Sequence, residues 1–153
     1  MECFQVFEAG EGIERAILRG LSARGGLRGR CANGGHPALL VVSPRAAARG
    51  TRLPRQCRTV LLPGGMGGVP PRAASAVSYG ASPRDSLTIS SREEGALWAA
   101  LQRELVTVEG QVVERQEFPL PLAPGEEELP LLACAGALLL LGIPPEELGQ
   151  ALS

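Results

Sequence analysis

Short, almost wholly apolar runs, bounded by residues that break regular structure, dominate the first half of the chain. Runs of this kind are typical of strands covered on both faces, as in parallel sheets. Gly, Pro or charged residues bound each run. The pattern predicts strands over Cys3–Phe7 and over residues 38–42, 59–62 and 76–79.

Apolar residues at helical spacing follow the first of these runs. Ile13, Ile17 and Leu21 recur every four residues and predict a helix over residues 13–21. Residues 24–35 are rich in Gly and Arg and predict an exposed loop. Residues 45–58 include Pro54, so they allow only a short helix.

The end of the chain predicts two more helices. Residues 129–141 form a continuous helical run that three glutamates precede, and acidic residues favour the positive end of a helix dipole. Gly142 stops this helix. Pro144 and Pro145 then open a second helix, because proline is well placed in a first turn.

Residues 87–118 fit two patterns. Residues 90–93 read SSRE, a capping box that could open a helix in which leucines lie four residues apart. Against this, Glu109-Gly110 forms a tight turn between residues 106–108 and the alternating residues 111–118, which is a hairpin pattern. We favour the hairpin and expect an antiparallel extension near residues 95–121. The predicted fold is therefore α/β: a single domain over residues 1–153 with a mainly parallel, Rossmann-like sheet flanked by helices, plus an antiparallel β-hairpin extension.

The chain lacks the side chains that most catalytic mechanisms use. It has no lysine, one histidine (His36) and one aspartate (Asp85), so all fifteen basic residues are arginines. Without lysine there is no P-loop phosphate clamp and no Schiff base, and one histidine cannot build a His-rich metal site. The composition argues against an enzyme and against a bound metal.

Charge is unevenly distributed. Residues 1–72 contain eleven arginines and four glutamates, a net +7, whereas residues 73–153 contain four arginines and twelve acids, a net −8. A basic half can bind nucleic acid, but no aromatic residues interleave with the arginines to stack on bases. The opposite charges of the two halves also allow self-association into a homo-oligomer.

The cysteines and the hydropathy pattern bear on location. Cys3, Cys31, Cys57 and Cys134 form no CxxC pair and predict reduced thiols. The longest apolar stretch is too short to span a bilayer, and no basic and apolar leader opens the sequence. We expect a cytoplasmic protein with no membrane association.

Three stretches of the second half follow one another in a distinctive order. Residues 77–88 read VSYGASPRDSLT, residues 118–122 read FPLPL, and residues 132–152 read LACAGALLLLGIPPEELGQAL. A strand with a Tyr-Gly pair, a small antiparallel extension and an alanine-rich helix ending in Gly-Ile-Pro-Pro-Glu-Glu resemble the later part of the central domain of Mur ligases, the ATP-dependent amino-acid ligases of peptidoglycan precursor synthesis. The resemblance covers about residues 57–153. It implies the fold of that domain and a link to the bacterial cell envelope.

The catalytic residues of that family have no counterpart here. There is no Gly-Lys-Thr phosphate loop, no lysine for carbamylation and no recognisable pair of magnesium-binding Glu and His. Where the family has an Asn-Asp-Asp-like turn that contacts nucleotide, this chain has PGGMGG over residues 63–68. We therefore expect a non-catalytic protein with no cofactor, which binds a partner protein or a small ligand.

Two other functions remain open. The first is a small-anion or nucleotide-binding module, because glycine amides after a strand can form an anion-binding nest. Arginines nearby would supply counter-charge, and a tyrosine at the carboxyl end of a strand lies where α/β sheets often bind ligands. The second is nucleic-acid binding through the arginine-rich first half. The candidate ligand residues are Gly64, Gly65, Gly67, Gly68, Arg72, Tyr79 and Arg84.

The remaining polar residues predict weaker roles. His36 lies in a Gly-Gly-His-Pro turn and is expected to be solvated. Neighbouring arginines could lower the pKa of Cys31 or Cys57, but a nucleophilic cysteine would need His36 as its base. Asp85 is expected to cap a turn.

Overall fold

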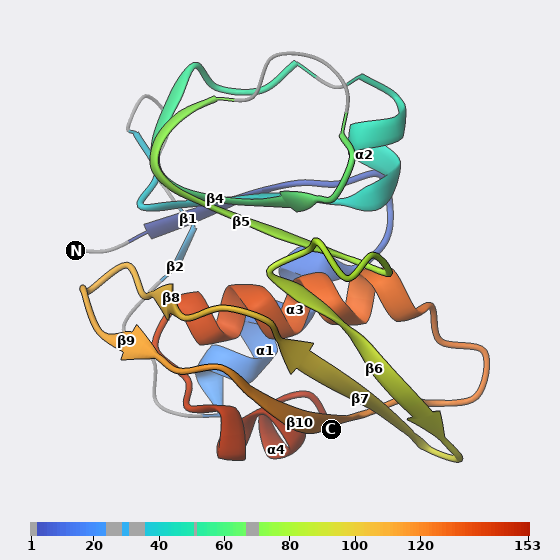
Figure 1. Ribbon diagram of the computed structural model, residues 1–153. Helices are drawn as coiled ribbons and strands as arrows, with labels where there is room; N and C mark the ends of the chain where they lie inside the picture. Colours follow the sequence, from blue (N-terminus) through green and yellow to red (C-terminus); the bar gives the residue numbers. More distant parts are fainter. Residues whose placement is uncertain (1–2, 24–28, 31–35, 51, 67–70) are drawn as a thin grey trace.

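The computed structural model describes residues 3–23, 29–30, 36–50, 52–66 and 71–153. A large sheet runs through the domain, with strands in the order β2-β1-β3-β4-β5-β6-β7-β10. Strands β2 to β6 are all mutually parallel, and β7 is antiparallel to both β6 and β10. The predicted α/β class, with a mainly parallel sheet and an antiparallel extension, is confirmed (Figure 1). The strands are β1 (Cys3–Phe7), β2 (Gly29–Arg30), β3 (Leu39–Val42), β4 (Gln56–Pro63), β5 (Arg72–Gly80), β6 (Leu87–Glu93), β7 (Ala96–Leu101), β8 (Leu105–Val106), β9 (Val112–Val113) and β10 (Gln116–Pro121).

The helices lie where the sequence predicts them. They are α1 (Ile13–Ser22), α2 (Pro44–Ala48), α3 (Glu128–Leu140) and α4 (Leu148–Ala151), the last preceded by a 3-10 turn η1 (Pro145–Glu147). The helix predicted to begin at the two prolines is thus a 3-10 turn followed by one short α-helical turn. The loop expected at residues 24–35 contains strand β2, and the other residues of that range lie outside the described ones.

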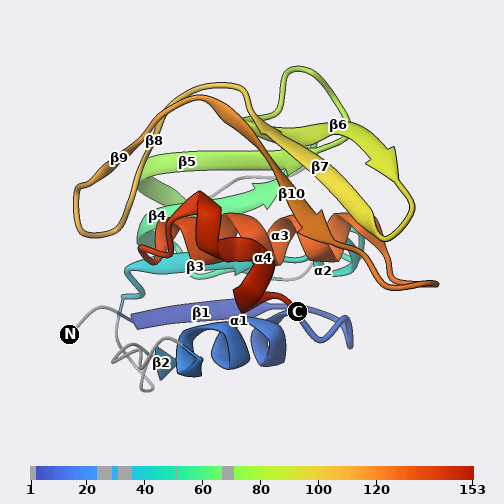
Figure 2. The same cartoon turned by 90° about the horizontal axis from the view of Figure 1, so that it is seen from below.

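Helix α3 is the centre of the main core. All ten residues from Leu131 to Leu140 are buried, because α1, α4 and the curled sheet enclose the helix on several sides (Figures 1 and 2). A helix that is apolar all around suits such a position. Gly136 allows a close approach, since a Cβ there would lie 3.1 Å from a methyl carbon of Leu61 on β4. A smaller cluster that includes Leu40, Val42 and Val60 packs on the other face of the sheet, against α2.

The antiparallel part begins where β5 ends. Strand β6 pairs with only the last two residues of β5, continues beyond it and turns at Gly95 into β7. The helix alternative for this segment is therefore wrong, and the hairpin is confirmed. A second hairpin joins β8 to β9 at the predicted Glu109-Gly110 turn. The edge strand β10 contains Pro119 and Pro121.

Two further findings bear on the sequence expectations. Cys3 is disulfide-bonded, whereas Cys57 and Cys134 are free thiols, so the expectation of reduced cysteines is wrong for Cys3. Cys31 lies outside the described residues. In the part of the chain that the structure describes, no helix has the length and apolarity that crossing a membrane requires.

Candidate functional site

The carboxyl ends of β1, β3, β4 and β5 meet at one edge of the sheet, here called the carboxyl edge. Open α/β sheets bind their ligands at such an edge. Helices α1 and α2 begin there, and the turns after β4 and β5 lie beside each other, because the Gly64 amide donates to the Tyr79 carbonyl at 2.9 Å. Any site of the Rossmann type would be built from these segments.

The amino terminus of α1 is occupied by a side chain of the protein itself. The Glu8 carboxylate accepts two hydrogen bonds, from the amides of Ile13 and Glu14, each at 2.9 Å. These are the first two amides of the helix, which have no partner within it. Gly12, with φ of 76°, makes the turn that lets Glu8 reach back to them. A phosphate or carboxylate ligand would use the same donors.

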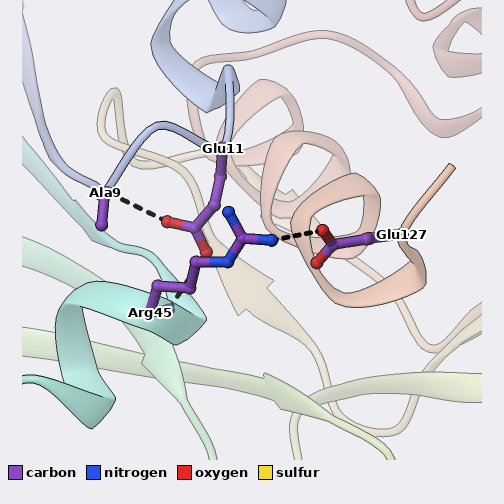
Figure 3. A network of polar contacts seen from close by, with 4 residues as sticks. All are labelled: Ala9, Glu11, Arg45 and Glu127. Carbon is purple, nitrogen blue, oxygen red and sulfur yellow. Dashed lines mark hydrogen bonds and ion pairs between the residues drawn. The ribbon is translucent and has the colours of Figure 1, made fainter.

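A second carboxylate occupies the start of α2. Glu11 accepts the amides of Ala9 at 3.0 Å and Arg45 at 3.1 Å (Figure 3). Ser43 accepts the amide of Ala46 at 3.0 Å. Because Pro44 has no N–H, Glu11 and Ser43 together satisfy the remaining donors of this helix start.

The charge of Glu11 is stabilised where it lies. Burial opposes ionisation, but hydrogen bonds from the Ser43 hydroxyl and from the amides of Ala9 and Arg45, together with the Arg45 charge, outweigh it. The pKa of Glu11 is therefore lowered. The guanidinium of Arg45 also pairs with Glu127 at the start of α3, at 2.6 Å.

Acidic groups continue around this edge. A cavity of about 260 Å³ beside the network is lined by Glu11, Glu126 and Glu127, with Arg19 as its basic residue among the described ones. The carboxylates of Glu8 and Glu11 already hold the helix amides, so the edge carries negative charge at the places where phosphates usually bind.

The glycine turn after β4 faces another carboxylate. Gly64 and Gly65 lie in the turn after β4, at the carboxyl edge, and Gly65 has φ of 73°. A Cβ on Gly64 or on Gly80 would overlap the carboxylate of Asp85, which is 4% exposed. Asp85 accepts the Ser82 amide at 3.2 Å, so its predicted role in capping a turn is confirmed. Gly67 and Gly68 lie outside the described residues.

Tyr79 has a structural position. Its side chain is fully buried, and its hydroxyl donates to the Val42 carbonyl at 2.6 Å. Burial, with smaller contributions from the charge of Glu11 and from Cys134, raises the pKa of this phenol. The hydroxyl thus ties the end of β5 to the end of β3 across the sheet.

The two candidate arginines lie at opposite edges of the sheet. Arg84 is exposed in the turn after β5, at the carboxyl edge. Arg72 begins β5 and pairs with Gln56, whereas Tyr79 pairs with Pro63 seven residues later. At about 3.3 Å of rise per strand residue, Arg72 is about 23 Å from the Gly64 turn. Arg72 and the glycine turn are therefore too far apart to contribute to one small-ligand site.

The amino edge of the same strands has its own cavity, of about 520 Å³, which His36, Gln56, Cys57 and Arg72 help to line. His36 is exposed, as expected.

Burial raises the pKa of Cys57, which overturns the suggestion that arginines would lower it. Burial also raises the pKa of Cys134, to about 12, with smaller effects from Glu8 and Glu126. No group of three or more metal-binding side chains occurs among the described residues.

The sequence analysis missed Glu8 and Glu11. Its signal was the segment EAGEG, in which two glutamates are interleaved with glycines directly after a strand and before a helix. Comparison with protein-family models and with curated proteins finds no match to this chain.

Proposed function

We propose that this protein is a non-catalytic binding domain of the Mur ligase central-domain type, acting in the cytoplasm and linked to the bacterial cell envelope. It works by holding a partner protein or a small ligand and does not turn over ATP. The proposal joins the sequence resemblance of residues 57–153 to the chemistry of the carboxyl edge.

The order of elements supports the resemblance. Strand β5 ends in Tyr79-Gly80 and leads through a short turn into the antiparallel strands β6, β7 and β10. The alanine-rich helix α3 then ends at Leu140, and the chain turns at Gly142 before Pro144 and Pro145. This is the succession that the resemblance implies.

The observation that carries the non-catalytic proposal is the occupation of helix starts by carboxylates. Glu8 holds the first two amides of α1 and Glu11 holds an amide of α2. Nucleotide phosphates at this edge would find these amide donors already bonded, and the glutamate carboxylates would repel them. With no lysine in the chain, nothing supplies the phosphate clamp that ligase chemistry uses. The Asp85 carboxylate beside Gly64 likewise disfavours an anion in the glycine turn.

Phosphate release from ATP tests this proposal directly. The purified protein with magnesium and ATP is expected to release no phosphate above buffer. A purified Mur ligase in the same buffer, supplied with its precursor and amino-acid substrates, is the positive control. ATP turnover that follows the protein through gel filtration, and that Glu11→Gln alters, would refute the non-catalytic function.

A further inference from the structure

The cavity at the amino edge combines arginine side chains with a lining that contains no carboxylate among the described residues. Its walls are the segment before β3 and the first residues of β4 and β5, held together by backbone hydrogen bonds such as Arg58 amide to Pro37 carbonyl at 3.2 Å. Gln56 and Arg72 lie side by side, since they are register partners on β4 and β5. The cavity is therefore built partly on strand ends, which hold the backbones of Gln56 and Arg72 in fixed relative positions.

The charges around this cavity are of one sign. The described residues that line it include the two cations Arg58 and Arg72 and no Asp or Glu. Arg58 is engaged, because its guanidinium donates to the Val108 carbonyl at 3.2 Å. Arg72 forms no ion pair with any residue in the described ranges, so its guanidinium is available to a ligand. The exposed Arg55 lies next to Arg72, because its carbonyl accepts the Arg72 amide at 2.9 Å.

The size and lining of the cavity select the kind of ligand. A volume of about 520 Å³ is in the range of small-molecule sites. Apart from His36, no aromatic ring lines the described part of its wall, so bases of nucleic acid would find no stacking platform. An arginine fork and a neighbouring amide side chain match oxyanions with several oxygens.

We propose that the amino-edge cavity binds a small multiply charged oxyanion, a molecule bearing phosphate or carboxylate groups, with Arg72 as its main anchor and Gln56 and His36 as hydrogen-bonding partners. The proposal rests on the function proposed above, because it names the class of small ligand that a non-catalytic domain would hold. It places that ligand about 23 Å from the glycine turn, at the opposite edge of the sheet.

Binding of pyrophosphate and of citrate, measured by melting temperature and by calorimetry at constant ionic strength, tests the cavity. Pyrophosphate offers phosphate groups and citrate offers carboxylate groups, so the comparison shows which of the two the cavity prefers. Arg72→Ala is expected to weaken binding about tenfold or more, whereas Arg72→Lys keeps part of it. Arg49→Ala is the matched control, because Arg49 is also an exposed arginine and does not line this cavity. It is expected to bind as the unchanged protein does.

Several results would overturn the cavity proposal. These are no binding of either anion, equal loss in Arg72→Ala and Arg49→Ala, or tighter binding of a single-stranded oligonucleotide that Arg72→Ala leaves unaffected. If Arg72→Ala fails to fold, NMR of the unchanged protein takes its place. The ring signals of the single histidine should shift when pyrophosphate is added, and no shift would count against the proposal. ATP turnover is not an outcome of this experiment, so failure of the non-catalytic function and failure of the cavity are separate results.

Discussion

Replacing Glu11 by glutamine tests the network at the carboxyl edge. The change keeps the shape of the side chain but removes its charge, and one amide oxygen must serve where two carboxylate oxygens accept from Ala9 and Arg45. Hydrogen bonds to charged groups contribute about 1.5 to 3 kcal/mol each, and water at this half-buried edge recovers part of the loss. We expect Glu11→Gln to lower the free energy of unfolding by about 1 to 2 kcal/mol at pH 7. For a domain of this length that corresponds to about 2 to 8 °C in melting temperature.

The pH dependence gives the sharper test. The folded state lowers the pKa of Glu11 below its ordinary value of 4.5, so its charge stabilises the fold above that pH. The stabilisation is lost as pH falls through the folded-state pKa. Urea unfolding can be followed by the fluorescence of Trp98. The free energies of unfolding of the unchanged protein and of Glu11→Gln should differ at pH 7, and this difference should narrow towards about pH 3. Glu114→Gln, at an exposed position, is the control. A difference in the free energy of unfolding that is equal at both pH values, or no difference at pH 7, would show that Glu11 does not act through its charge.

Three further predictions concern the interior. Tyr79→Phe should cost about 1 to 2 kcal/mol, because it leaves the buried Val42 carbonyl without its donor, and an unchanged urea midpoint would contradict this. Gly80→Ala should destabilise by more than about 1 kcal/mol through overlap with Asp85, and Asp85→Ala should relieve much of that cost, so additive effects in the double variant would refute the contact. Cys134 should resist alkylation in the native protein at about pH 8, because burial raises its pKa to about 12; mass analysis showing rapid labelling would disagree.

The fold was largely predictable from local patterns. Apolar runs gave the central strands, and spacing gave α1 and α3, because burial on one or both faces leaves a periodic trace. Residues 90–105 were ambiguous because leucines spaced four residues apart fit one face of a helix. The same spacing also fits a strand such as β7, in which alternate side chains point into the core. Tertiary pairing of β7 with both β6 and β10 decided for strand.

The site was less predictable, for a geometric reason. Glu11 bonds to the amide of Arg45, 34 residues away, and no local pattern encodes that contact. Arg72 is close in sequence to the glycine turn, but a whole strand length separates them because β4 and β5 are parallel. Their closeness in the sequence suggested that Arg72 and the glycine turn form one site, but the sheet places them at two opposite edges. The burial that raises the pKa of Cys57 is likewise a property of the packed fold.

The two prolines of β10 restrict how this domain can associate with others. Pro119 and Pro121 stand at the outer strand of the sheet, where neither has an N–H to offer an approaching chain. Extension of the sheet by a foreign peptide or by a second copy needs a regular row of such donors along that margin. Recognition through this side must therefore use side chains and shape, and a continuous intermolecular sheet built on β10 is not expected even at high concentration.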